Sequence, residues 1–336
     1  MSVQQAGRGL VIRVLAAVLL ALVPVIVLSL SAWSAATGLL VLGIVPTLSA
    51  TPSGPRAMLS TAVASVSTAL IAVLVANTGP WTPWLGAAVV AALSLATGAL
   101  AVRGLHPVGA AAISFAAYVL VDPSSAIDVL GAALPAWGSA ALVAGGVLLG
   151  CAWVLGAVTL LLRGVRLPPA AAAATLPYGV LLAVLCGLFT LVCVLWFAGT
   201  NAWWAVMTVA VILQPTQDET RTKLRGRIAG TVLGCTVAAL AVLLLPSMFV
   251  SVLLGVVAAL ASVVLLLSGA AYWKYSLAVT VSVMLLTFER NEVLGGDLQR
   301  IVVTVIAAAV TAAAVGVVTR LLGPPETADE GPAGAR

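Results

Sequence analysis

Four cations fall within seven residues in the second half of the sequence, where they could attract a negatively charged ligand. Arg221 and Lys223 lie in a polar turn, and we interpret them as charges of a solvated loop. Arg225 and Arg227 enter the apolar segment that follows, where a cation must reach water, pair with a carboxylate or line a hydrated space. Two interpretations stay open for this pair: a hydrated mouth that attracts anions, or an ion pair that holds Arg227 to a nearby carboxylate.

Further polar residues in apolar surroundings extend this candidate path. A short apolar helix ends at Gln214-Pro215, because proline donates no backbone hydrogen bond and restrains the residue before it. Asp297 and Arg300 are three residues apart, one helical turn, and can pair at the opposite end of the path. Together with Arg225 and Arg227, the residues expected to bind the anion or line its path are Trp204, Thr208, Gln214, Arg56, Asp297 and Arg300.

Side chains that support enzyme or metal chemistry are sparse. The single histidine, His106, is expected to be a loop residue, although a pKa near neutrality would also suit a proton shuttle. The four cysteines lie in apolar stretches without CxxC spacing and are best explained as small packing residues. The sequence has no metal-ligand cluster, no phosphate-binding glycine loop and no nucleophile–base pair. It therefore predicts a protein that is not an enzyme and that has no cofactor or metal.

The amino-acid composition indicates whether water or lipid surrounds the chain. Of the 336 residues, 62% are hydrophobic and only 7% are charged, against about a quarter charged in an ordinary soluble domain. So few charged side chains cannot cover a soluble fold of this length, and the bilayer must therefore surround most of the chain. This excludes a secreted enzyme, a cytosolic enzyme and a nucleic-acid binder, since the net charge of +5 belongs to the loops of a membrane protein.

Hydropathy along the chain predicts an all-α polytopic protein with about twelve transmembrane helices. The second, fifth and eighth are shorter than the roughly 20 residues that a perpendicular span needs. The predicted helices lie at about 10–30, 32–48, 57–76, 85–102, 107–121, 136–161, 178–198, 202–214, 226–245, 247–268, 271–287 and 299–322.

The distribution of Lys and Arg orients these helices. With the N-terminus inside, alternating spans place thirteen of the 15 cations on the cytoplasmic side and only Arg290 and Arg300 outside. This split follows the positive-inside rule, and most tryptophans then lie near the outer interface. We therefore predict a multi-pass protein of the bacterial inner membrane with both termini in the cytoplasm.

The two halves of the sequence correspond at a constant offset of 169 residues. Pro46-Thr47 matches Pro215-Thr216, Arg56 matches Arg225, and Asp128 matches Asp297. Because six helices return the chain to its starting side, the two repeats would be parallel, with a pseudo-two-fold axis along the membrane normal. The predicted organisation is a cytoplasmic N-terminus at 1–9, a six-helix repeat at 10–162, a cytoplasmic linker at 163–177, a second six-helix repeat at 178–322 and a disordered cytoplasmic tail at 323–336.

Three glycines at four-residue spacing accompany the cations: Gly226, Gly230 and Gly234. Such a ridge lets two helix backbones approach closely, so we expect it to pack against another helix and to set the helix pair that lines the path. The corresponding residues of the first half are also small: Ala57, Thr61 and Ser65.

Residues 200–234 resemble the fusaric acid resistance and aromatic acid exporter family of integral membrane transporters. The resemblance rests on a Trp-rich helix, Gln214-Pro215, a polar turn, and the pattern Arg227-x-x-Gly230-Thr231-x-x-Gly234. The run Trp204-Ala-Val-Met-Thr-Val209 is also similar to the plant aluminium-activated malate transporters, which are anion channels. The resemblance implies a membrane unit that transports organic anions.

These observations predict a secondary transporter that exports organic anions, including aromatic ones, across the inner membrane. No ATPase motif is present, so a gradient must supply the energy, and we expect coupling to protons. The anion would be collected by the cytoplasmic arginines, pass Thr208 and Gln214 along the repeat interface, and leave near Asp297 and Arg300.

Two alternative functions stay open. A passive organic-anion channel would carry only downhill flux, and a non-transporting membrane scaffold would carry none. The predicted partners are the lipid bilayer and a small organic anion, with no nucleic acid, and the chain would act as a monomer or a homodimer.

Overall fold

Helices account for every regular element in the described part of the chain, which confirms the all-α class. The computed structural model describes residues 8–29, 31, 33, 36–124, 134–162, 176–244, 247–287 and 293–322. The α-helices there are α1 Arg8–Ser29, α2 Thr37–Ser49, α3 Pro55–Ala76, α4 Thr82–Ala101, α5 His106–Val121, α7 Ala136–Leu161, α8 Leu176–Trp196, α9 Trp203–Ile212, α10 Gln217–Leu244, α11 Met248–Leu267, α12 Tyr272–Thr287 and α13 Val293–Leu322, with short 3-10 helices at Thr51–Ser53 (η3) and Gly79–Trp81 (η4).

Several predicted features lie outside the described residues. They are most of the N-terminal segment, Asp128, Arg290, residues 163–175 of the linker and the tail 323–336. The last two residues of the predicted linker, 176–177, already belong to α8.

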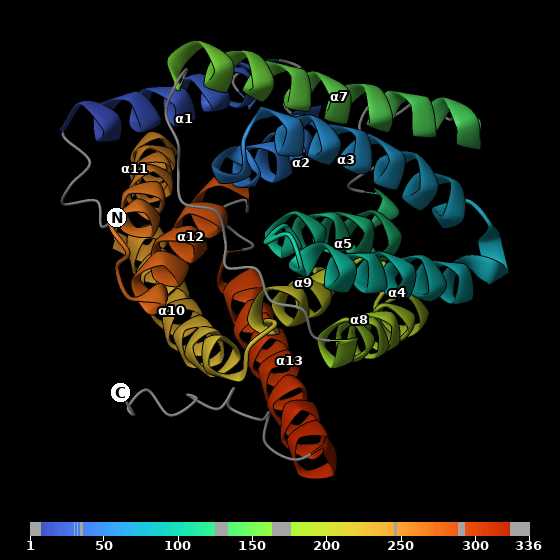
Figure 1. Cartoon of the computed structure of the whole chain (residues 1–336). Coiled ribbons are helices and arrows are strands. Elements are labelled where there is room, and N and C mark those ends of the chain that lie inside the picture. The colour runs from blue at the N-terminus through green and yellow to red at the C-terminus, as the bar shows by residue number, and fades with distance from the viewer. Residues whose placement is uncertain are drawn as a thin grey trace, which may run out of the picture.

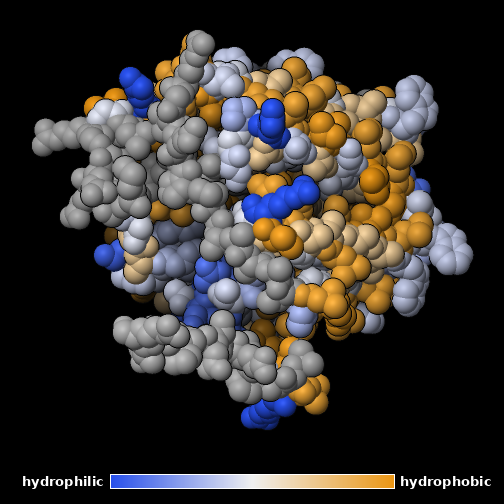
Figure 2. All heavy atoms as spheres, viewed as in Figure 1, coloured by the Kyte–Doolittle hydropathy of each residue, from blue (hydrophilic) through white to orange (hydrophobic). Residues whose placement is uncertain are grey.

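Seven of the described helices are long and apolar enough to cross a membrane: α3, α4 with η4, α7, α8, α10, α11 and α13. Five helices contain shorter apolar stretches, namely α1, α2, α5, α9 and α12, and among them are the three that the sequence predicts to be short. Large apolar side chains point outward, including Leu149, Leu160 and Leu243, and apolar side chains cover much of the face shown in Figure 2. These surfaces suit lipid, so the chain is a multi-pass membrane protein, and a full set of twelve spans stays a prediction.

The start of α10 is the largest difference from the predicted helix bounds, because this helix begins at Gln217 instead of residue 226. Its first turn contains Asp218 and Glu219, whose negative charges interact favourably with the helix dipole. Glu219 and Lys223 are also four residues apart, a spacing that stabilises helices. The interpretation of Arg221 and Lys223 as loop residues is therefore wrong: both lie on the helix.

The helices pack into two groups that contact each other at several crossings. Helices α2 and α3 pack against α7, and helices α10 and α11 pack against α12 (Figure 1). Between these groups, α4 lies along α8, α5 packs against α9, and α1 touches α11 over a smaller contact. The α4–α8 crossing is tight, since a Cβ added to Gly179 would lie 3.1 Å from the Cα atom of Gly98. Helix α9 thus contacts α5, α8, α10 and α13.

The glycine ridge of α10 faces α12. A Cβ added to Gly230 would lie 2.6 Å from the carbonyl oxygen of Trp273, and one added to Gly234 would lie 2.9 Å from the carbonyl oxygen of Leu277. Both distances are shorter than a van der Waals contact, so the two backbones approach to a distance that only glycine allows.

Alanine in place of Gly230 should therefore destabilise the protein, whereas alanine in place of Gly316 should not. A Cβ at Gly316, on α13, would meet no described atom within 4 Å. Both substitutions gain the same helix propensity, roughly 1 kcal/mol, so their difference isolates the packing cost, which is typically about 1–3 kcal/mol for an overpacked contact. Thermal unfolding of the purified variants measures this difference. Equal midpoints would mean that α10 and α12 do not approach this closely.

Candidate anion-binding site

The turn between α9 and α10 is fixed by side chains rather than by backbone alone. Helix α9 ends at Ile212, and the backbone N–H of Gln214 donates to the Thr220 hydroxyl at 3.0 Å. The Gln214 amide nitrogen donates to the carbonyl oxygens of Val211 and Leu213, both at 2.9 Å. Gln214 is buried here, and its bonds set the direction in which α10 leaves the turn.

The two arginines of α10 point in different directions. Arg227 is only 4% exposed, whereas Arg225 is exposed, because two residues along an α-helix are separated by about 200° of rotation. Arg56, the counterpart of Arg225 in the first half, is likewise exposed on the first turn of α3. Of these three cations, only Arg227 lies inside the helix bundle.

Arg227 lies beside Tyr272 at the start of α12, and the phenol and the guanidinium interact. Its Nε atom has no hydrogen-bond partner among the described residues. Asp218 and Glu219 are exposed, and no ion pair joins either of them to Arg227 in this part of the chain. A buried guanidinium with an unused donor is costly, so this position favours an anionic or aqueous partner.

Four buried hydroxyls, which we call the hydroxyl row, lie beyond Arg227: Thr208 on α9, Thr231 on α10, and Ser276 and Thr280 on α12. None of their oxygens has a hydrogen-bond partner within the described ranges. Helical Ser and Thr usually donate to the carbonyl four residues earlier, as Thr190 does to Cys186 at 2.7 Å. An unpaired buried hydroxyl costs about 1–3 kcal/mol, so water or a ligand is needed to satisfy the row.

Arg300 lies at the far end of the hydroxyl row and is covered by aromatic side chains. Its Cζ atom is 3.7 Å from the centroid of the Trp204 ring, and its Nη1 atom is 3.6 Å from the sulfur of Met284. Trp204 stacks on Trp203 at 4.2 Å, and Trp203 meets Tyr118 edge-on at 5.1 Å. The contact joins two residues that the sequence proposed separately, Trp204 and Arg300. Asp297 precedes them on α13, and its side chain lies outside the described residues.

The register of the helices gives the separation of the two buried arginines. Gln217 at the start of α10 hydrogen-bonds Thr319 near the end of α13, and the two helices pack against each other, so they run antiparallel. Arg227 is ten residues from Gln217, and Arg300 is 19 residues from Thr319. The difference of nine residues corresponds to about 14 Å along the bundle at 1.5 Å per residue. Ser276 and Thr280 pack against Gly230 and Gly234, so the hydroxyl row lies between the two levels.

The residues that sequence reasoning missed are Thr231, Tyr272, Ser276, Thr280 and Met284. The four-residue spacing of Tyr272, Ser276 and Thr280 is a signal for a polar stripe on an apolar helix. In contrast, the first half has apolar residues at several positions that match the site at the 169-residue offset, although Arg103 matches Tyr272. Met58 matches Arg227, Leu39 matches Thr208, Ala62 matches Thr231 and Ala111 matches Thr280.

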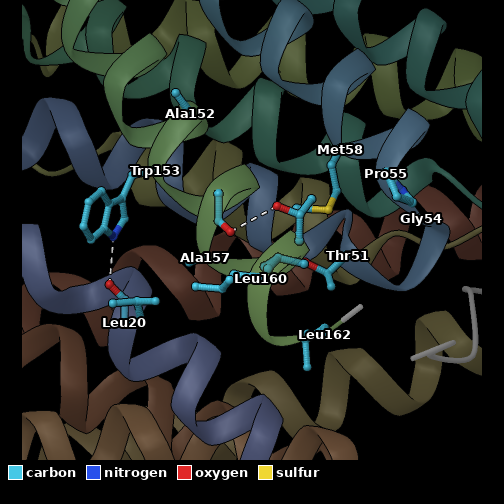
Figure 3. A pocket seen from close by; sticks show the side chains of 13 residues that line it. Leu20, Thr51, Gly54, Pro55, Met58, Ala152, Trp153, Ala157, Leu160 and Leu162 are labelled. Atoms are coloured by element: carbon cyan, nitrogen blue, oxygen red, sulfur yellow. Dashed lines mark hydrogen bonds between the residues drawn. The ribbon is translucent and has the colours of Figure 1, made fainter. Parts of the chain in front are cut away.

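A separate pocket of about 870 Å³ lies in the first half, between α1, α3 and α7 (Figure 3). None of the described residues that line it is charged, and most are apolar, including Met58, Leu160 and Leu162. The Trp153 indole N–H beside it donates to the carbonyl oxygen of Leu20 at 2.8 Å, which replaces the helical donor missing at Pro24. This apolar pocket suits a hydrocarbon group, not an anion. Among the described residues, no three His, Cys, Asp or Glu side chains gather to hold a metal ion.

These features define a multi-pass membrane protein with cations and hydroxyls buried inside its second half. Residues 186–315 match the model of the fusaric acid resistance protein-like family, which confirms the resemblance predicted from residues 200–234. The matched stretch runs from α8 into α13 and contains the hydroxyl row, Arg227, Trp204 and Arg300. No curated protein and no solved structure matches the chain significantly. The family is of a membrane transporter type and is not an enzyme family.

The contact between Trp204 and Arg300 should appear as a coupling energy in a double-mutant cycle. A desolvated cation–π contact is worth about 2 kcal/mol, so Trp204→Leu and Arg300→Met should be less than additive in their effects on unfolding free energy. Trp81→Leu is the control, because its side chain is 66% exposed. A coupling no larger than that between Trp81→Leu and Arg300→Met would contradict the contact.

Proposed function

We propose that this protein is a secondary transporter that exports organic anions, including aromatic ones, and is driven by the proton gradient. The observation that carries this proposal is Arg227, a buried guanidinium at one end of the hydroxyl row, inside the region that matches a transporter-type family. Buried cations in membrane segments mark ligand and ion pathways, because their cost is otherwise hard to sustain.

In the proposed mechanism, Arg227 holds the anion at the cytoplasmic end of the path. At an effective dielectric constant of about 20, two unit charges about 4 Å apart attract each other by roughly 4 kcal/mol before desolvation and screening. The hydroxyl row then replaces part of the hydration shell of the anion as it moves between α10 and α12. Arg300 receives the anion at the other end, where its guanidinium lies against the Trp204 ring and can pair with the negative charge.

The helix order supports the proposed pair of parallel six-helix repeats. Helices α3 and α10 end at Ala76 and Leu244, and helices α5 and α12 end at Val121 and Thr287. These ends agree with the 169-residue offset to within about three residues, a difference smaller than one helical turn. The contacts repeat as well, since α3 and α10 pack against α7 and α13 respectively.

A passive anion channel is the second candidate. The hydroxyl row favours it, because buried neutral hydroxyls without partners also suit diffusion of an anion without coupling. Uphill flux of labelled benzenesulfonate into proteoliposomes under an imposed pH gradient, beyond the flux into protein-free liposomes, would support the exporter. Flux that only follows the concentration gradient would support the channel, and no flux at all would contradict both.

Arg227 variants test the site directly. Arg227→Gln should raise the half-saturation concentration of benzoate flux about tenfold or more, which corresponds to about 1.4 kcal/mol, and Arg227→Lys should keep much of the flux. The matched control is Arg225→Gln, which removes the same charge from the exposed face of α10. It should cause a smaller change that salt screens further.

Flux is measured per folded molecule at two salt concentrations, so that lost stability is not mistaken for lost affinity. An unchanged half-saturation concentration and salt dependence in Arg227→Gln would remove Arg227 from the path.

Single-cysteine labelling tests the proposed orientation, with both termini in the cytoplasm of the inner membrane. In a variant without the four native cysteines, Asn77→Cys in the turn after α3 should react with an impermeant maleimide on intact cells. Gln217→Cys at the start of α10 should react only in inverted vesicles. Successive spans cross the membrane in opposite directions, which places the α9–α10 turn on the cytoplasmic side. Labelling of Gln217→Cys in intact cells would contradict the proposed orientation.

A further inference from the structure

His106 is buried at the point where α5 meets the α9–α10 turn. The sequence suggested a loop residue, but His106 is the first residue of α5 and is only 5% exposed. Its Nδ1 atom has no hydrogen-bond partner in the part of the chain that the structure describes. The Gln214 side chain contacts the imidazole. A buried imidazole with an open nitrogen can bind a proton there, and the cost of its charge depends on its neighbours.

The charged neighbours of His106 connect it to Arg227. Within the described residues, the charges that act on the imidazole are Glu219 and Lys223 on α10, and Arg103 before α5 is exposed. Glu219, Lys223 and Arg227 follow one another at four-residue spacing, so they lie along one face of α10. The imidazole therefore lies near charges of the first two turns of α10, and Arg227 follows Lys223 by about one turn on the same face of that helix.

We propose that His106 is the proton-binding residue of the anion site, and that its protonation strengthens anion binding beside Arg227. This inference rests on the proposed function. A proton on the imidazole adds a positive charge at this end of the site. The positive charge of Lys223 disfavours this protonation, and the negative charge of Glu219 favours it. A bound anion relieves the repulsion between these cations. Proton and anion thus favour each other, and by linkage each raises the affinity of the other by the same factor.

The sign of the pH dependence follows from this linkage. Anion affinity should be high where the imidazole is charged, at low pH, and should fall as the pH rises through the titration of His106. Benzenesulfonate is a suitable probe because it stays ionised throughout, so its own charge contributes no pH dependence. Burial and the charge of Lys223 lower the pKa of His106, so we expect the probe to bind the purified full chain about tenfold more tightly at about pH 5 than at about pH 8.

His106→Gln should bind the probe with the same affinity at both pH values. The matched control is Arg103→Gln, which removes an exposed charge from the turn before α5 without removing a titrating group. It should keep the tenfold ratio. Calorimetric titration in lipid nanodiscs measures all three proteins.

A second readout needs no variant, because the chain contains only one histidine. NMR of the 15N-histidine-labelled protein should show a single imidazole whose titration midpoint rises by about one pH unit when benzenesulfonate saturates the site.

A wild-type affinity that is independent of pH, a pH dependence that His106→Gln retains, or a midpoint that the probe does not move would each overturn the role of His106 and leave the anion site standing. Failure of benzenesulfonate and benzoate to bind wild-type protein at any pH would instead remove the proposed function, and this inference with it.

Discussion

The close approach of α10 to α12 is the constraint on which the candidate site depends. Because Gly230 and Gly234 have no side chains, Ser276 and Thr280 lie directly against the backbone of α10. The same approach buries Arg227 next to Tyr272. A wider separation would admit lipid to this face, and a cation that faces the bilayer centre costs roughly 2.5–3.5 kcal/mol or more. The ridge therefore fixes the helix pair and also determines what surrounds the charge.

The polar residues inside the second half are not needed to pack this arrangement of helices. In the first half, α2, α3, α5 and α7 pack with Leu39, Met58 and Ala62 where the second half has Thr208, Arg227 and Thr231. Leu39 and Ala62 belong to one hydrophobic core cluster and Met58 to another, and none of the three brings a donor that needs a partner. The second half thus keeps a costly set of groups at positions where the first half packs apolar residues, and such a local conflict is expected at functional sites.

Much of the fold follows from hydropathy, because lipid demands long apolar helices and their ends coincide with turns rich in Pro and Gly. The start of α10 could not be predicted from hydropathy, because its polar first turns resemble a loop. Asp218 and Glu219 are nevertheless signals for a helix start. The burial of Arg227 but not Arg225 could have been derived from helix phase and the glycine ridge. The contact of Arg300 with Trp204 could not have been derived from the sequence, because it joins helices almost a hundred residues apart and depends on tertiary packing.

The environments of the two buried arginines differ in a way that suits directional movement along the proposed path. Arg227 has an open donor among the described residues, whereas the Arg300 guanidinium lies against the Trp204 ring and the Met284 sulfur. The aromatic face and the thioether already stabilise the charge of Arg300, so it should hold an anion less strongly than Arg227 does. Passage requires binding strong enough for entry and weak enough for exit. The hydroxyl row covers the roughly 14 Å between them with neutral groups, which lower the desolvation barrier without adding a third charge to trap the anion.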